Sequence, residues 1–462
     1  MLRHILALVV LALPLTTPSN AQTQVPQSQT EIALGFAPLV KQAAPAVVNI
    51  YASRVVETRA SPFAGDPFFE QFFKGFGQSR PRVQNSLGSG VILSADGIVV
   101  SNFHVVGMAT EIRVVMTDRR EYSAKVILAD RESDLAILQL DGAADLPHLD
   151  LRDSDKVDVG ELVLAIGNPF GVGQTVSSGI VSGLARSGIA TGNARGYFLQ
   201  TDAPINPGNS GGALIDVNGR LMGINTSILS RSGGSNGIGF AIPSNLVAEF
   251  VRQARAGNAA FERPWAGMAG QAVDFDLAGS LGLGVPGGVL ISDIHPDSPF
   301  AATGFRVGDV ITHVGGEPVN SPAEMLFRMT ITGIGGKTTV SRVRDEETSE
   351  IEVAMIAAPD TPPAEETALD DTTPLPGLNV ARANPATIAR FGLPLTLTGV
   401  LVTDPGPYGA RVGLRTGDVI ASINGAEVEA PGDVARILAA SGRGVRMEVL
   451  RGGQRIGLRF RI

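Results

Sequence analysis

The segment GNSGG at residues 208–212 places one serine among glycines, directly before the apolar run ALIDV. Small neighbours let a backbone approach a substrate carbonyl closely and direct main-chain N–H groups at one point. Ser210 is therefore a candidate nucleophile. The same letters fit the G-x-S-x-G elbow of an α/β-hydrolase, but that elbow needs a helix after the serine. A hairpin turn is predicted at residues 217–220 instead, which makes the elbow the weaker alternative.

A nucleophilic serine needs a base, and the chain has only five histidines. His4 lies in the N-terminal apolar segment, His148 follows a loop proline, and His295 and His313 lie in the C-terminal part. His104 remains, at the end of the strand-like run GIVVSNFHVV. Taken alone it could be an ordinary core histidine, but the presence of GNSGG favours a base.

A histidine base is oriented by a carboxylate. Asp134 begins the alternating run DLAILQL, where a carboxylate can point inward, whereas the alternative, Asp130, fits a turn better. The chain order His104, Asp134, Ser210 differs from the order Ser, Asp, His of the α/β-hydrolases. The spacing thus predicts a serine hydrolase of a different fold.

Residues 46–257 consist of short β-rich runs separated by Gly, Asn, Asp and Pro, and these runs must position the three residues. The pattern is typical of an all-β barrel or sandwich. A helix is predicted over 243–257. An insertion at 57–84 contains six phenylalanines. A loop of this length is usually functional or disordered, and both a flap over its own core and a subunit contact are open.

An internal repeat follows. GVLISD at 288–293 matches GVLVTD at 399–404, and GFRVGDVI at 304–311 matches GLRTGDVI at 413–420. The two units are predicted at 258–358 and 377–462. The segment between them, 359–376, is rich in Pro, Thr and acidic residues and is predicted to be an extended linker without a core.

Residues 1–21 combine Arg3, an apolar run and a small-x-small end at Ala21, as in a secretory signal peptide. A membrane anchor is the alternative, but it needs about 20 apolar residues in a row. Residues 22–45 then form an N-terminal segment, and a periplasmic location is expected. The net charge of −8 disfavours nucleic-acid binding, and the absence of cysteine excludes disulfides and thiolate metal sites. No metal or cofactor is expected.

Five segments resemble the Deg/HtrA family of secreted serine proteases; they are SNFHVV (101–106), DLAIL (134–138), GNPFGVGQTVSSGIVS (167–182), QTDAPINPGNSGGAL (200–214) and GIGFAIPS (237–244). The resemblance implies a mainly β fold: a chymotrypsin-like double β-barrel followed by two α+β PDZ domains. It implies that His104 is the general base, Asp134 its orienting carboxylate and Ser210 the nucleophile. An oxyanion hole is then expected at Gly208, Asn209 and Ser210.

The resemblance also implies an ATP-independent periplasmic endopeptidase that degrades unfolded or misfolded envelope proteins and has chaperone activity. Homotrimers or larger trimer-based assemblies are expected, with C-terminal peptides as partners of the PDZ domains. A non-catalytic chaperone or peptide-binding scaffold is the alternative. It is disfavoured because a binding protein has no need of His104, Asp134 and Ser210 together.

Substrate selection is predicted from residues near Ser210. Pro204 stands six residues before it, where an acid would bind Arg or Lys, so a trypsin-like pocket is not expected. A small apolar pocket would use Ile205, Asn225, Thr226, Ser227 and Ile228. The resemblance implies cleavage after Val, Ile or Ala. The same side chains could be ordinary core. Pro204 also departs from the family pattern, which puts loop switching in doubt.

The two PDZ units contain candidate carboxylate-binding loops. In the first unit this loop is Ala266-Gly267-Met268, where Ala266 replaces the larger aliphatic residue usual in the family. Its counterpart in the second unit is Gly377-Leu378-Asn379, directly after the linker. A PDZ groove adds an extended peptide to a sheet edge and captures its terminal carboxylate. Both loops could instead be simple buried strand starts.

Overall fold

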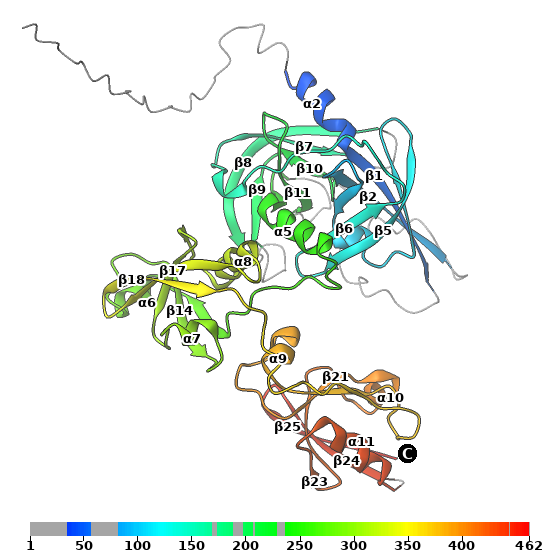
Figure 1. Cartoon of the computed structure of the whole chain (residues 1–462), viewed down its shortest axis with the longest axis vertical. Coiled ribbons are helices and arrows are strands. Elements are labelled where there is room, and N and C mark those ends of the chain that lie inside the picture. The colour runs from blue at the N-terminus through cyan, green and yellow to red at the C-terminus, as the bar shows by residue number, and fades with distance from the viewer. Residues whose placement is uncertain are drawn as a thin grey trace, which may run out of the picture.

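The computed structural model describes residues 35–56, 82–168, 173–187, 197–206, 208–228, 236–442 and 444–461. The predicted signal peptide and the six phenylalanines of the predicted insertion lie outside these residues. A lobe of two β-barrels is followed by two smaller sheet units (Figure 1). Within the described ranges, no helix is long and apolar enough to cross a membrane.

The first barrel is closed and has the strand order β1-β2-β3-β6-β5-β4. Its strands are β1 (Val47–Val56), β2 (Arg82–Ile92), β3 (Ile98–Ser101), β4 (Glu111–Val115), β5 (Glu121–Asp130) and β6 (Leu135–Leu140). Helix α2 (Ala37–Ala43) and a 3-10 turn, Ala44–Ala46, precede it, and α4 (Phe103–Val106) follows β3. β3 is buried along its whole length because it lies inside the lobe, which explains its unbroken apolar sequence.

The second barrel is also closed, in the order β10-β11-β12-β9-β8-β7. Its strands are β7 (Leu162–Gly167), β8 (Thr175–Ser187), β9 (Tyr197–Thr201), β10 (Ala213–Ile215), β11 (Leu221–Ile228) and β12 (Gly239–Pro243). A 3-10 turn, Ser154–Lys156, lies between the barrels. Helix α5 (Ser244–Arg255) follows β12 and confirms the helix predicted there.

One buried apolar cluster joins the two barrels. It contains Val91 and Ile137 of the first barrel, Ile166 of the second and the α5 face around Phe250. The ring of Phe250 stacks on Phe261, with 3.7 Å between the ring centroids. Because buried side chains are packed as densely as an organic crystal, this shared cluster fixes the barrels relative to each other and thus fixes residues at their junction.

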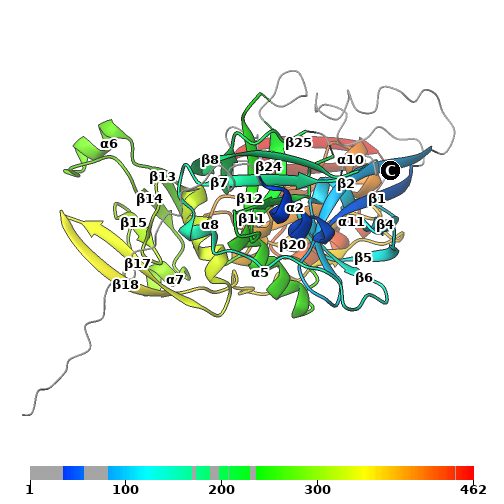
Figure 2. The ribbon, with the colours of Figure 1, turned by 90° about the horizontal axis from the view of Figure 1, so that it is seen from above.

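The first repeat unit is a sheet in the order β13-β14-β15-β17-β18, with β16 paired to β15. Its strands are β13 (Met268–Ala272), β14 (Val289–Ile294), β15 (Val310–Val314), β16 (Glu317–Pro318), β17 (Lys337–Arg344) and β18 (Glu347–Ala354). Its helices are α6 (Phe275–Ser280), α7 (Pro299–Ala302) and α8 (Pro322–Thr332). The unit lies to one side of the barrels, and α8 packs against α5 (Figure 2).

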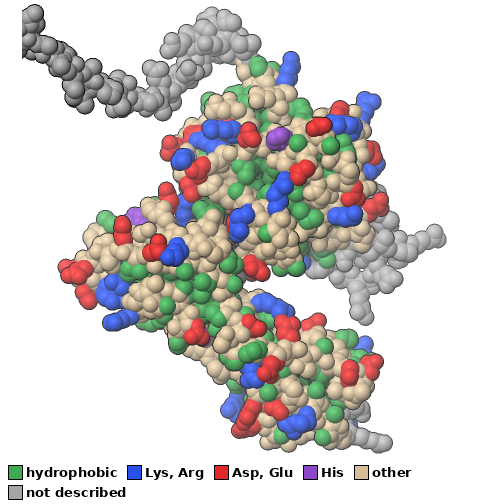
Figure 3. Space-filling model, viewed as in Figure 1, with side chains coloured by type: hydrophobic (Ala, Val, Ile, Leu, Met, Phe, Trp, Pro, Cys, Tyr) green, Lys and Arg blue, Asp and Glu red, His purple; other side chains and the backbone are tan. Residues whose placement is uncertain are grey.

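The second repeat unit has the same order, β20-β21-β22-β24-β25, with one extra strand, β19, on the outer edge of β20. Its strands are β19 (Thr367–Ala368), β20 (Asn379–Arg382), β21 (Val400–Asp404), β22 (Val419–Ile423), β23 (Ala426–Glu427), β24 (Gly444–Arg451) and β25 (Gln454–Arg461). Its helices are α9 (Pro385–Phe391), α10 (Gly406–Arg411) and α11 (Pro431–Ala439). A narrow waist separates this unit from the first in the space-filling view (Figure 3). The predicted fold, a mainly β double barrel followed by two α+β units, is confirmed.

The prediction that 359–376 is an extended linker without a core needs correction. Leu369 and Leu375 are buried in the apolar cluster of the second unit, together with Val380 and Val402. The segment also contributes strand β19 to the sheet. Its Pro and acidic content marks the exposed positions, but two leucines are enough to anchor it because each removes a large apolar side chain from water.

Candidate active site

The structure brings His104, Asp134 and Ser210 together between the two barrels. β3 and β6 pair antiparallel, with Ser101 opposite Ala136, so the end of β3 and the start of β6 lie side by side. His104 follows β3 in helix α4, and Asp134 immediately precedes β6. Ser210 comes from the second barrel, in the loop between β9 and β10.

His104 and Asp134 form a close pair. Nδ1 of His104 lies 2.9 Å from Oδ1 and 2.8 Å from Oδ2 of Asp134. The His104 backbone N–H also donates to Oδ1, at 3.0 Å. An ionised carboxylate accepts only, so this contact assigns the proton to Nδ1 and leaves Nε2 as the basic nitrogen of a neutral imidazole.

The position of Asp134 is fixed by its backbone conformation and by two hydrogen bonds to its carbonyl. Its φ of 52° is left-handed, a conformation that Asp tolerates better than most residues. Its carbonyl accepts from the Phe103 N–H at 3.1 Å and from the Asn102 side-chain amide at 2.9 Å. These two bonds connect the turn before β6 to the residues that lead into α4, and so fix the carboxylate against the imidazole.

Thr226 of β11 links the pair to the serine. Its hydroxyl donates to Oδ2 of Asp134 at 2.6 Å, and its carbonyl accepts from Oγ of Ser210 at 2.9 Å. The Ser210 side chain is buried. Because a hydroxyl has one proton, the Ser210 O–H in this conformation is directed at the Thr226 carbonyl.

Two glycines follow Ser210 because neighbouring backbone carbonyls lie too close for a side chain at either position. A Cβ on Gly211 would lie 2.1 Å from the Ser89 carbonyl oxygen of β2, and one on Gly212 would lie 2.2 Å from the Ile166 carbonyl oxygen of β7. Gly211 also has φ of 83°. The serine loop is thus wedged between strands of the two barrels, where only glycine fits.

The backbone N–H groups around the serine differ in their use. The Asn209 N–H donates to the Asn206 carbonyl at 3.0 Å, and the Asn209 side chain is buried and accepts from the Thr175 hydroxyl. Among the described residues, the N–H groups of Gly208 and Ser210 donate to no acceptor. Two donors therefore remain available next to Oγ of Ser210.

Ser89 is a site residue that motif reasoning missed. Its hydroxyl donates to the Gly208 carbonyl at 2.6 Å and accepts from the Asn168 N–H at 2.8 Å, and its own N–H donates to the Ser210 carbonyl at 2.9 Å. Ser89 is fully buried and belongs to β2 of the other barrel. Ser89 stands between two glycines within β2, and no local pattern in the sequence marks this role.

We expect Ser89→Ala to lower kcat about 10-fold to 100-fold with little change in KM. The Gly208 carbonyl would lose its hydrogen bond from Ser89, and the nearby N–H groups of Gly208 and Ser210 would be held less firmly in place. The free energy of unfolding should fall by about 1–3 kcal/mol, since two buried partners lose their hydrogen bonds. Steady-state kinetics and urea unfolding measure both. An unchanged kcat with reduced stability would assign Ser89 a structural role only.

Three of the five residues predicted to form the substrate pocket have described side chains, and all three are buried. Ile205 is 2% exposed in the core of the second barrel, and Asn225 is fully buried, with its amide donating to the Ala213 carbonyl. Thr226 supports Asp134, as described above. Burial of these three side chains agrees with the alternative that they belong to the core. The side chains of Ser227 and Ile228 lie outside the described residues.

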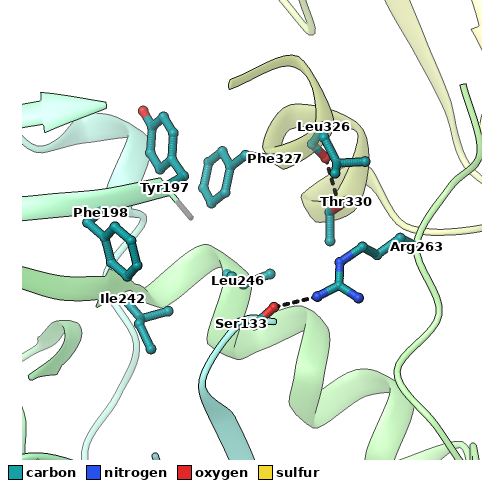
Figure 4. A pocket seen from close by; sticks show the side chains of 9 residues that line it. All are labelled: Ser133, Tyr197, Phe198, Ile242, Leu246, Arg263, Leu326, Phe327 and Thr330. Carbon is teal, nitrogen blue, oxygen red and sulfur yellow. Dashed lines mark hydrogen bonds between the residues drawn. The ribbon is translucent and has the colours of Figure 1, made fainter. Parts of the chain in front are cut away.

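Arg263, in the connection between the barrels and the first repeat unit, reaches back to the turn that carries Asp134. Its guanidinium donates to Ser133 at 2.7 Å, as Figure 4 shows. It also donates to Asp130 at 2.5 Å. Asp130 also accepts from the Ser133 N–H at 2.7 Å. The aspartate that was the alternative orienting residue thus stiffens the turn that presents Asp134.

A second contact joins the first repeat unit to the barrels through α8. The rings of Phe327 and Tyr197 stack with 3.9 Å between centroids (Figure 4), and Arg328 pairs with Asp155 at 2.5 Å. Burial raises the pKa of the Tyr197 phenol. Phe327 is 5% exposed and belongs to the cluster that joins the barrels, so α8 contributes to the core of the double-barrel lobe.

The predicted carboxylate-binding loops occupy equivalent places in the two repeat units. Gly267 has φ of 61° and Gly377 has φ of 82°. β13 pairs Ala269 with Asp293, and β20 pairs Asn379 with Asp404. This register aligns Gly377 with Gly267, one position away from the predicted match of Gly377 to Ala266.

In the described part of the chain, no group of three or more His, Asp or Glu residues could hold a metal ion.

A double β-barrel with a histidine, an aspartate and a glycine-bounded serine at the junction is the architecture of a chymotrypsin-like serine protease. Residues 88–224 match the family model of a trypsin-like peptidase domain, and residues 263–355 and 399–451 each match that of a PDZ domain.

The chain is 38% identical over 433 residues to the periplasmic pH-dependent serine endoprotease DegQ of Escherichia coli K12, covering 92% of this chain and 91% of DegQ. It is 34% identical to the periplasmic serine endoprotease DegP of the same organism, covering 92% of this chain and 91% of DegP. A solved structure of the HtrA-type protease AlgW with a decapeptide matches at 39% identity and TM-score 0.52, covering 70% of this chain and 99% of that one. The chain therefore belongs to the DegP/DegQ family of serine endoproteases, and it is a serine endopeptidase.

Proposed function

We propose that the protein hydrolyses peptide bonds through an acyl-enzyme in which Ser210 is the nucleophile, His104 the general base and Asp134 the orienting carboxylate. The observation that carries this proposal is the connected set of bonds from His104 through Asp134 and Thr226 to Ser210. Asp134 accepts from Nδ1 and so keeps Nε2 available to take the serine proton.

In the acylation step, the Ser210 O–H turns from the Thr226 carbonyl toward His104 and gives its proton to Nε2 as Oγ attacks the substrate carbonyl. The resulting oxyanion accepts from the N–H groups of Gly208 and Ser210. The imidazolium then protonates the leaving amine, and a water molecule repeats the sequence to release the acid. Each donor to the oxyanion contributes about 10²–10³ in rate.

The substrates that we propose are unfolded or misfolded polypeptides of the periplasm. Relatives over the whole chain are named periplasmic endoproteases, which supports this location. The PDZ domains would bind chain ends, and chaperone activity would follow from holding such chains without cleavage. We expect small apolar residues before the cut, and the residues that line the pocket stay a prediction.

Assembly into homotrimers is part of this proposal. Leu162 of β7 and Ile180 of β8 lie opposite each other on neighbouring strands of the second barrel, and Val159 lies close by in sequence; all three side chains are exposed. Apolar side chains that gather on an outer face are typical of a subunit contact. The predicted insertion at 57–84 is the other candidate contact, but 57–81 lie outside the described residues.

The experiment that tests the proposed chemistry is labelling with a fluorophosphonate, which modifies only an activated serine. We expect one label per chain, located on the Ser210 peptide by mass spectrometry, together with degradation of β-casein and blocking of that degradation by the label. Heat-unfolded protein gives the matched control for non-specific labelling. Labelling of another serine, or casein cleavage that survives full labelling, would contradict the proposal.

A further inference from the structure

The two PDZ domains differ at the sheet edge that would receive a peptide. β13 is the outer strand of the first domain, and in the described chain no strand pairs with its free edge. The equivalent strand of the second domain, β20, carries β19 on that edge. β19 comes from the segment before the domain, so the second domain has a strand added from its own chain.

The added segment runs antiparallel to β20. Thr367 lies opposite Val380, and Ala368 lies opposite Asn379. Upstream, the Ala364 carbonyl accepts from the Arg382 N–H at 2.6 Å. Residues 364–369 therefore follow the whole length of β20, with main-chain hydrogen bonds of the kind that hold an extended peptide at a sheet edge.

Leu369 ends this segment at the predicted carboxylate-binding loop. Its N–H donates to the Leu378 carbonyl, and its carbonyl accepts from the Gly377 N–H, both at 2.8 Å. Its side chain is 3% exposed, in the same buried cluster as Val434 of α11. A PDZ ligand places a carboxylate oxygen and an apolar terminal side chain in such a loop, so Leu369 stands where the last residue of a ligand would lie.

We propose that residues 364–369 occupy the peptide-binding edge of the second PDZ domain as an internal ligand, with Leu369 in the place of the terminal residue. The surface fits a free chain end that has an aliphatic last residue, and such a peptide binds only by displacing the segment. This inference rests on the peptide-binding role proposed for the PDZ domains, and it is independent of the catalytic assignment.

The segment is tethered by bonds that a competing peptide could break. Glu365 pairs with Arg382 at 3.0 Å, and Glu366 pairs with Arg390 at 2.6 Å. Both glutamates are exposed, so each ion pair contributes little. Only domains whose edge is free can bind an external peptide, so the apparent affinity is the intrinsic affinity multiplied by the fraction of free edges. Weakening these ion pairs raises that fraction.

The test is the binding stoichiometry of the full mature chain in a Ser210→Ala background, measured by isothermal titration calorimetry. The probe is a ten-residue peptide that ends in Leu with a free carboxylate. Its C-terminally amidated twin measures binding at the active-site cleft, which does not need the carboxylate. We expect one carboxylate-dependent site per chain in this background, at the open edge of the first domain, and two after Leu369→Ala.

Leu369→Ala also creates a cavity that the probe's leucine can fill. We expect the variant to melt lower, and the free-acid peptide, but not its amide, to restore the melting temperature. A second variant, Glu365→Arg/Glu366→Arg, changes only exposed side chains and keeps Leu369. It should bind the probe at the second domain several-fold more tightly. Asp371→Arg is its control, because Asp371 is exposed in the same loop and forms no ion pair among the described residues.

Two carboxylate-dependent sites in the Ser210→Ala chain without further substitutions would overturn the proposal, because the edge of β20 would then be free. Unchanged stoichiometry and affinity in the Glu365→Arg/Glu366→Arg protein, or the same change in Asp371→Arg, would also overturn it. The Ser210→Ala chain could also show no carboxylate-dependent site and then one site after Leu369→Ala. That result would support occupation of the second domain by its own segment, and it would show that the first domain does not bind the peptide. Loss of casein cleavage bears on the catalytic proposal alone.

Discussion

Ser210→Ala is expected to lower kcat/KM for casein degradation about 10⁶-fold, because no other oxygen lies in the place of Oγ between the two barrels. The fold should persist. The substitution removes one hydrogen bond, to the Thr226 carbonyl, and a single neutral bond of this kind contributes about 1 kcal/mol to the free energy of unfolding. Peptide binding at the PDZ domains should be unchanged.

Ser244→Ala is the matched control for this substitution. Ser244 is also buried and also donates to a carbonyl, that of Arg152, but it begins α5 away from the catalytic pair. We expect it to lose stability to a similar degree and to keep activity within a few fold. Residual cleavage by Ser210→Ala above about one part in 10³ would contradict the nucleophile assignment, since a missing nucleophile cannot be replaced by binding alone.

Asp134→Asn is expected to lower kcat about 10⁴-fold. An asparagine keeps the shape of the side chain but presents either an N–H₂ or a single carbonyl oxygen toward His104. The imidazole then loses the acceptor that holds the proton on Nδ1, and the Thr226 hydroxyl loses the charge to which it donates. KM should change much less than kcat, because Asp134 lies behind the histidine and touches no substrate.

Asp130→Asn separates the orienting role from a supporting one. Asp130 lies four residues earlier in the same turn and binds Arg263 and the Ser133 N–H. We expect it to lower kcat about tenfold or less, by loosening the turn that presents Asp134. Stopped assays with the same casein preparation measure both variants. Equal losses from the two substitutions would contradict the assignment of Asp134 as the orienting carboxylate.

The candidate catalytic residues could be proposed from the sequence because they depend on short-range patterns. Glycines beside a serine, one histidine after an apolar strand and an aspartate before another are local features, and the chain order disfavoured the α/β-hydrolase elbow. The structure explains the glycines, since a Cβ on Gly211 or on Gly212 would stand 2.1 or 2.2 Å from a backbone carbonyl oxygen.

Other parts were not legible because they depend on contacts between distant segments. Ser89 and Ser210 are joined by a hydrogen bond across 121 positions in the chain, and nothing local marks Ser89 as a partner. Ile205 and Asn225 have side chains that suit a pocket, but whether such residues face a cleft or a core depends on which way the strand packs. The barrel packs them inward.

The sequence by itself thus determined the chemistry, the mainly β fold and the repeat, because residue type, turn signals and apolar periodicity act over a few neighbouring positions. The tertiary structure alone decided how these parts are joined: which strand supports the serine loop, that Arg263 and α8 attach the first PDZ domain to the barrels, and that Leu369 enters the second. Such contacts form between segments far apart in the chain, where the free energy of burial and of hydrogen bonding selects partners that no local pattern names.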